Sequence, residues 1–192
     1  MRDRKFQKRV VIDIGHPANV HLFRYLYAGL TQKEWSCIFA IRDKEFTIEL
    51  LKAYDLKYML LENREHSLLK RVATIPLLCY RFFQLVTRNK PRLVISRGST
   101  HATLVCKLLH IHHIVFTDTE SAGLINQLSN YLSSCVLTGI SYKKKCGKYH
   151  IRYPGYHELA YLHPNRFTPD SEILRHIGLQ PSERYAIVRF VS

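Results

Sequence analysis

The sequence has no two cysteines at Cys-x-x-Cys spacing, and its five cysteines are far apart. This spacing does not fit a disulfide framework, so we expect reduced thiols and a cytoplasmic protein. Residues 1–8 are charged and no apolar segment follows them, so we expect no signal peptide. The apolar runs are only a few residues long, far short of the roughly 20 that a transmembrane helix needs.

Acidic residues are absent from Ser67 to Thr117, while basic residues are frequent there. Over the 192 residues, 29 Lys and Arg stand against 15 Asp and Glu, which gives a formal net charge of +14. Such a charge favours an anionic partner, namely nucleic acid, a phospholipid surface or a phosphate-bearing substrate. No nucleic-acid-binding motif accompanies the charge, so nucleic acid is the least favoured of the three.

Basic and apolar residues interleave in the segment 67–92. A helix of this composition can lie on an anionic membrane surface, which would place the protein at the inner face of the membrane. An ordinary helix, with its apolar face in the core and its cations in water, explains the pattern slightly better. Pro76 lies inside the segment, and we expect a helix to break or begin there.

The Gly-x-Gly-x-x-Gly spacing of a dinucleotide site is also absent, so a pyrophosphate clamp is not favoured. Instead, the largely β-branched run 10–14 leads into Gly15-His16-Pro17, and a helical pattern follows directly. This is a strand–turn–helix junction, typical of the first unit of an α/β sheet. Asp13 lies within the strand, where burying a charge is costly, and we expect it to bond a neighbouring loop.

Strands and helices alternate through the N-terminal three quarters of the chain. Strands are expected at 9–14, 36–41, 57–61, 92–96, 113–117 and 135–138. The alternation predicts an α/β fold with a Rossmann-like parallel sheet and helices on both faces. Residues 1–150 would form this N-terminal domain, and the aromatic, proline-bounded segment 151–168 an interdomain connector. Residues 169–192, with a helix at 169–178 and a strand at 185–191, would begin an incomplete second α/β domain.

Polar side chains follow the first, fourth and fifth strands, at the edge where ligands bind in open parallel sheets. Imidazole and carboxylate groups can transfer protons, and glycines allow a substrate to approach the backbone. The candidate catalytic residues are His16, Asp118 and Glu120. The candidate substrate-binding residues are Gly15, His21, Arg97, Gly98, Ser99, Thr100 and Thr119.

Some of these residues have simpler explanations. Asp118 and Glu120 are explained equally well as caps of the helix that follows. His21 is better explained as a residue on the face of the first helix. The cluster 110–113, His-Ile-His-His, lies at the opposite edge of the sheet without a nearby cysteine or carboxylate, so we expect no metal site.

Three stretches resemble a known family. They are 12–21 (IDIGHPANVH), 116–120 (FTDTE) and 155–164 (GYHELAYLHP). They resemble the domain of unknown function family 354 (DUF354), which is similar to GT-B glycosyltransferases and to UDP-N-acetylglucosamine 2-epimerases. The resemblance runs along essentially the whole chain and implies the N-terminal, acceptor-side domain of a two-domain fold.

The resemblance implies glycosyl transfer in polysaccharide or lipid-linked sugar assembly. The partners would be a sugar nucleotide and a sugar or lipid-phosphate acceptor, with the nucleotide-sugar as a substrate of a longer form and no other cofactor. Some GT-B members also dock a basic and apolar patch onto the membrane, a role that residues 67–92 would suit. The alternative is a truncated, non-catalytic binding module or half of a split protein, which docks on an anionic membrane surface or on a partner chain.

Epimerase chemistry fits the sequence less well. The epimerases carry Gly-Asp-Thr after the fourth strand, where this chain has Gly98-Ser99-Thr100 and therefore lacks that catalytic carboxylate. Glu120 corresponds to the glutamate of their Glu-Ala-Gly-Leu-Arg pattern, but one extra residue follows it and the arginine is missing.

Overall fold

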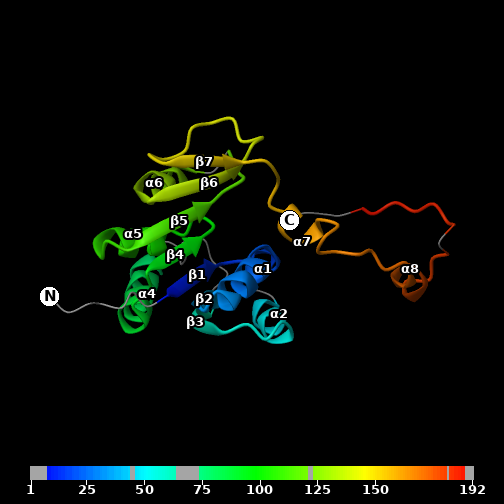
Figure 1. The fold of residues 1–192 in the computed structure, drawn as a ribbon, viewed down its shortest axis with the longest axis horizontal. Coiled ribbons are helices and arrows are strands. Elements are labelled where there is room, and N and C mark those ends of the chain that lie inside the picture. Colours follow the sequence, from blue (N-terminus) through cyan, green and yellow to red (C-terminus); the bar gives the residue numbers. More distant parts are fainter. Residues whose placement is uncertain (1–7, 44–45, 64–73, 121–122, 181, 189–192) are drawn as a thin grey trace. The chain divides into compact units, whose positions relative to one another are not determined.

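The computed structural model describes residues 8–43, 46–63, 74–120, 123–180 and 182–188 (Figure 1). It contains a seven-stranded sheet in the order β3-β2-β1-β4-β5-β6-β7, and every pairing is parallel. The strands are β1 (Arg9–Ile14), β2 (Ser36–Asp43), β3 (Tyr58–Asn63), β4 (Leu93–Ser96), β5 (His112–Phe116), β6 (Cys135–Gly139) and β7 (His150–Tyr153). The predicted Rossmann-like α/β fold is confirmed.

Helices connect these strands and cover the two faces of the sheet (Figure 1). They are α1 (Ala18–Gln32), α2 (Thr47–Ala53), α4 (Ile75–Asn89), α5 (Thr100–Leu108) and α6 (Leu124–Leu132). Pro76 lies in the first turn of α4. Of the two expected outcomes, a helix break or a helix start, the structure therefore shows a helix start. Residues 67–73 lie outside the described residues.

Alternation along β1 separates two of the three buried clusters of the described core. Val10, Ile12 and Ile14 pack with residues of α1 and α2 on one face of the sheet. Val11 packs on the other face with α4 and α5. Successive side chains of a strand point to opposite faces, and both faces of a parallel sheet are covered, so β1 is buried from Val10 to Ile14.

The strand order reverses between β1 and β4, which are neighbours in the sheet although β2 and β3 lie between them in sequence. The turns after these two strands therefore leave in different directions and open a crevice at the carboxyl edge. This topological switch point lies between Gly15 and Gly98.

The strand β7 was not expected. It pairs with β6 and extends the sheet to residue 153, into the segment interpreted as a connector. Two of its four residues, Ile151 and Arg152, are exposed, as at the edge of a sheet. Such a short strand with polar and basic residues lacks the apolar run that identifies a buried strand.

The chain divides into the units Met1–Tyr161 and Leu162–Ser192. The second unit contains the short helix α8 (Glu172–His176), near the expected helix. Residues 185–188 form no strand, contrary to expectation, and 189–191 lie outside the described residues. The side chains of Ile187 and Val188 are exposed, so no sheet covers them. Among the described helices, none is long and apolar enough to cross a membrane.

Candidate functional site

A pocket of about 330 Å³ lies at the switch point. The turns after β1, β4 and β5 and the end of β2 form its walls. Of the residues predicted from the sequence, it brings together Gly15, His16, Arg97, Gly98, Ser99, Asp118 and Thr119. Asp13, Asn19, Arg42 and Asn130 also line it.

Asp13 lies at the base of this pocket and is fully buried. Its carboxylate accepts a hydrogen bond from the Ser99 hydroxyl and another from Nε2 of His101, at 3.1 Å. Burial alone would raise the pKa of Asp13, but the His101 imidazole and the Arg42 guanidinium outweigh it and hold the pKa below its usual range. The expected bond from Asp13 to a neighbouring loop is therefore present, and it ties β1 to the start of α5.

The polar contacts continue from Ser99 into the sheet. The Ser99 backbone N–H donates to Oγ of Ser96 at 3.4 Å, and that hydroxyl lies 2.8 Å from Nε2 of His113. The Thr103 hydroxyl donates to the Ser99 carbonyl, so Nδ1 of His113 is the donor in its 3.4 Å contact with Thr103. Burial lowers the pKa of His113 to about 4, so this ring is neutral at neutral pH.

A second cluster centres on Asp118, on the loop after β5. Arg97 donates to Oδ1 of Asp118, Thr119 donates to the same oxygen at 3.0 Å, and Nδ1 of the buried His157 donates to Oδ2 at 3.1 Å. The hydrogen bond from His157, with Arg97 and Thr119, holds the pKa of Asp118 well below its usual range, although partial burial opposes this. Asp118 is therefore ionised throughout the neutral range.

Two glycines shape the pocket. Gly98 has a φ of +78°, a left-handed conformation that a side chain would strain. A Cβ at Gly15 would lie 2.1 Å from Nη2 of Arg42, so only glycine lets this guanidinium lie against the turn. Gly15 thus leaves room for Arg42, which lines the same pocket as Arg97.

His16 is exposed in the turn after β1. Its Nδ1 accepts the backbone N–H of Ala18 at 3.1 Å, so the neutral ring carries its proton on Nε2. In this tautomer His16 offers a hydrogen-bond donor rather than a base.

Three predicted residues lie outside the pocket lining. His21, on α1, faces Tyr54 and Tyr161, and burial and nearby Arg24 lower its pKa. Oε1 of Glu120 accepts the backbone N–H of Lys143 at 2.7 Å, so Glu120 fixes the loop before β7. Thr100 begins α5, and its hydroxyl accepts a hydrogen bond from Ser129.

The sequence interpretation missed His101 and His157. His157 lies within the stretch 155–164, which carried the family resemblance, but nothing in its spacing pointed to Asp118, 39 positions away. His101 follows Ser99 by two residues and could have been found as a polar residue entering a buried helix face. Among the described residues, no three His, Cys, Asp or Glu side chains gather in a way that would hold a metal ion.

The fold is similar to several solved structures. MurG from Acinetobacter baumannii matches with a TM-score of 0.60 at 14% identity, over 75% of this chain and 44% of that chain. The UDP-GlcNAc 2-epimerase from Neisseria meningitidis, solved with UDP-GlcNAc, matches with a TM-score of 0.56 at 13% identity, over 68% and 40%. The glycosyltransferase SsfS6 from Streptomyces sp. SF2575 matches with a TM-score of 0.51 at 14% identity, over 68% and 49%.

These likenesses show a GT-B-type Rossmann-like fold, as predicted, and the chain spans less than half the length of each of these structures. A comparison with curated proteins found no relative with significant similarity. Residues 8–190 match the family model described as "Protein of unknown function (DUF354)", which confirms the resemblance seen in the sequence. The chain therefore belongs to the DUF354 family.

Proposed function

We propose that this chain is the acceptor-binding half of a GT-B-like sugar-nucleotide enzyme that transfers glycosyl groups in polysaccharide or lipid-linked sugar assembly. The observation that carries the proposal is the switch-point pocket, where the cationic Arg42 and Arg97 and the ionised Asp118 share one space. The similarity of the fold to glycosyltransferases and to an epimerase solved with UDP-GlcNAc supports it.

The chemistry of the pocket suits a phosphorylated sugar or a lipid phosphate. Arginine guanidinium groups bind phosphate through paired, charge-assisted hydrogen bonds, and His16 adds an N–H donor. Asp118 accepts hydrogen bonds and would orient a sugar hydroxyl. Its lowered pKa makes it a weak base, so its contribution to transfer is mainly positioning. His21, Thr100 and Glu120 lie outside the pocket lining and would make no contact with the ligand.

A second α/β half would hold most of the sugar nucleotide, on a longer form of the chain or on a partner chain. Binding to the present half can still be tested directly. N-acetylglucosamine 1-phosphate and farnesyl phosphate serve as probes of the two acceptor classes, and amide NMR shifts of Gly15 and Gly98 report occupation of the pocket.

We expect at least one probe to bind, and Arg97→Ala to weaken binding by about tenfold or more, because a charged hydrogen bond is lost. His21→Ala, outside the pocket, is the matched control and should leave affinity unchanged. Failure of both probes to shift either glycine at millimolar concentration, or equal effects of the two substitutions, would contradict the proposal.

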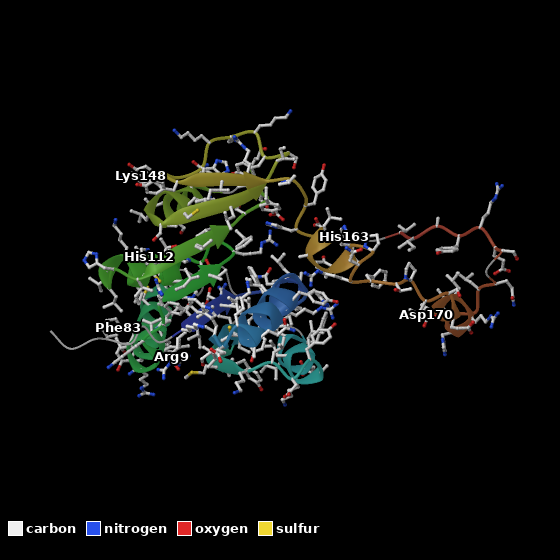
Figure 2. The ribbon with its side chains drawn as sticks, in the orientation of Figure 1. Arg9, Phe83, His112, Lys148, His163 and Asp170 are labelled. Carbon is white, nitrogen blue, oxygen red and sulfur yellow. The ribbon has the colours of Figure 1, made fainter. Side chains whose placement is uncertain are left out.

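A second candidate function, docking on an anionic membrane surface, is favoured by the outer face of α4. Leu78, Phe82 and Leu85 are buried, yet Leu77, Tyr80 and Phe83 are exposed by 43%, 59% and 37% (Phe83 is labelled in Figure 2). The helix is thus apolar on two faces and also carries Arg81 and Arg88. This surface would place the protein at the inner face of the membrane.

Co-sedimentation with phosphatidylglycerol vesicles tests the docking. The double variant Leu77→Ser and Phe83→Ser should lose most of the binding to these vesicles. Leu104→Ser, at an equally exposed leucine on α5, is the control and should keep it. Equal binding to neutral and anionic vesicles would rule out this function.

A further inference from the structure

A second, larger pocket lies at the opposite edge of the sheet from the switch point. Its volume is about 650 Å³, and its walls are the amino end of β5, the residues just before β6 and β7, and the C-terminal ends of α5 and α6. It shares no lining residue with the switch-point pocket. Figure 2 shows His112 and Lys148, both from its lining, at this same end of the strands.

The charge of this pocket has one sign. Lys107 and Lys148 line it together with His110 and His112, and its lining contains no Asp or Glu. Both lysines are exposed, and within the described part of the chain neither forms an ion pair with a carboxylate. Lys107, in the last turn of α5, also offsets the negative end of that helix dipole. Lys148 lies on the loop before β7 and not in a helix, so a helix dipole does not explain its position.

Aromatic rings stand beside these cations. Tyr131 and Tyr149 line the same pocket, and they are exposed by 69% and 60%. Nζ of Lys148 lies 5.2 Å from the centre of the Tyr149 ring, so a cation and an aromatic face are presented together. Ile111 and Leu132 add apolar wall. Such a combination binds a planar, partly apolar group on one side and an anion on the other.

We infer that this pocket binds a nucleoside phosphate, with the base against Tyr131 and Tyr149 and the phosphates at Lys107 and Lys148. Its volume lies within the range of small-molecule sites, about 300–1,000 Å³. The site is independent of the proposed function, because it lies at the other edge of the sheet and uses none of the residues given a role there. It gives the chain a nucleotide contact apart from the switch-point pocket.

Calorimetric titration of the whole chain with ADP, GDP, UDP and CDP tests the inference, with inorganic pyrophosphate and adenosine as the phosphate-only and base-only probes. At least one nucleoside diphosphate should bind more tightly than either partial probe. Lys107→Ala with Lys148→Ala should weaken its binding by about tenfold or more. Tyr131→Ala should weaken binding of the nucleotide and leave that of pyrophosphate unchanged.

Matched controls locate the site. Lys145→Ala removes an exposed lysine outside the pocket, and Tyr156→Ala removes a comparably exposed tyrosine on the loop after β7, so both should bind like the wild type. The imidazole resonances of His112 should shift with the nucleotide, while those of His157, at the carboxyl edge, should not. No binding of any of the four nucleotides, or loss of binding through Arg97→Ala but not through the lysine pair, would overturn the inference.

Discussion

His113 makes the stability of this protein depend on pH in a defined window. Burial lowers its pKa to about 4 from 6.5, so the folded state binds fewer protons than the unfolded state between these values. Stability should therefore rise with pH across this window, and acidification from pH 6.5 to 4 should cost about 3 kcal/mol. Urea unfolding of the wild type and of His113→Gln at pH 7.5, 5.5 and 4.5 measures this loss of stability.

The difference between the two proteins is the informative quantity, because His21 and His150 also have lowered pKa values. His113→Gln should flatten the pH dependence, because the buried ring that must take up a proton in acid is then absent. Parallel curves for the wild type and His113→Gln would show that His113 does not carry the effect.

At the same scale, the site was only partly visible in the sequence. A carboxylate inside an apolar strand pointed to a bonded Asp13, because an unpaired buried charge is too costly. Its partners Ser99 and His101 lie 86 and 88 positions away, and no local pattern names them. Which polar residues meet in the pocket is decided by tertiary contacts that no local pattern shows. Glu120, for example, lies outside the pocket and binds the backbone N–H of Lys143 instead.

Two glycines allow opposite predictions for the elements that contain them. Gly29 lies within α1 and a Cβ there would meet nothing within 4 Å, so Gly29→Ala should stabilise the protein by about 0.5–1 kcal/mol. Gly139 ends β6, and a Cβ there would lie 2.5 Å from the carbonyl oxygen of Gly155. Gly139→Ala should destabilise by about 1–3 kcal/mol, since backbone must move. Chemical denaturation measures both changes, and effects of the same sign would contradict this account.

The helices and strands could be predicted where their burial requires a recognisable pattern of apolar residues. The strands β1 and β4 are mostly apolar because helices cover both of their faces, and the bounds predicted from the sequence differ by at most one residue from the observed ones. The edge strand β7 has no such pattern, because it forms a ladder with β6 alone. For residues 185–188 the error is the opposite one, because an apolar run predicted a strand that the structure does not form. An apolar run becomes a strand only where another strand is there to pair with it.

At the scale of the whole molecule, the two units differ in what holds them together. The unit Met1–Tyr161 contains the buried clusters of the sheet, whereas none of the described residues in 162–188 is buried. A five-residue helix such as α8 gains little from its own hydrogen bonds. Ordering of the second unit therefore has little apolar burial to offset its conformational entropy.

Trypsin should reveal this difference. Cleavage at Arg166 or Arg175 should be at least about tenfold faster than at Arg24 in α1, because cutting inside a packed helix needs costly local unfolding. Mass spectrometry of the peptides over time gives the two rates.

The fragment that retains residues up to Arg166 keeps Arg97, Asp118 and His157, so it should bind the sugar-phosphate probes as the whole chain does. Equal cleavage rates would mean that the segment after Tyr161 is protected, and loss of binding after cleavage would mean that this segment contributes to the pocket.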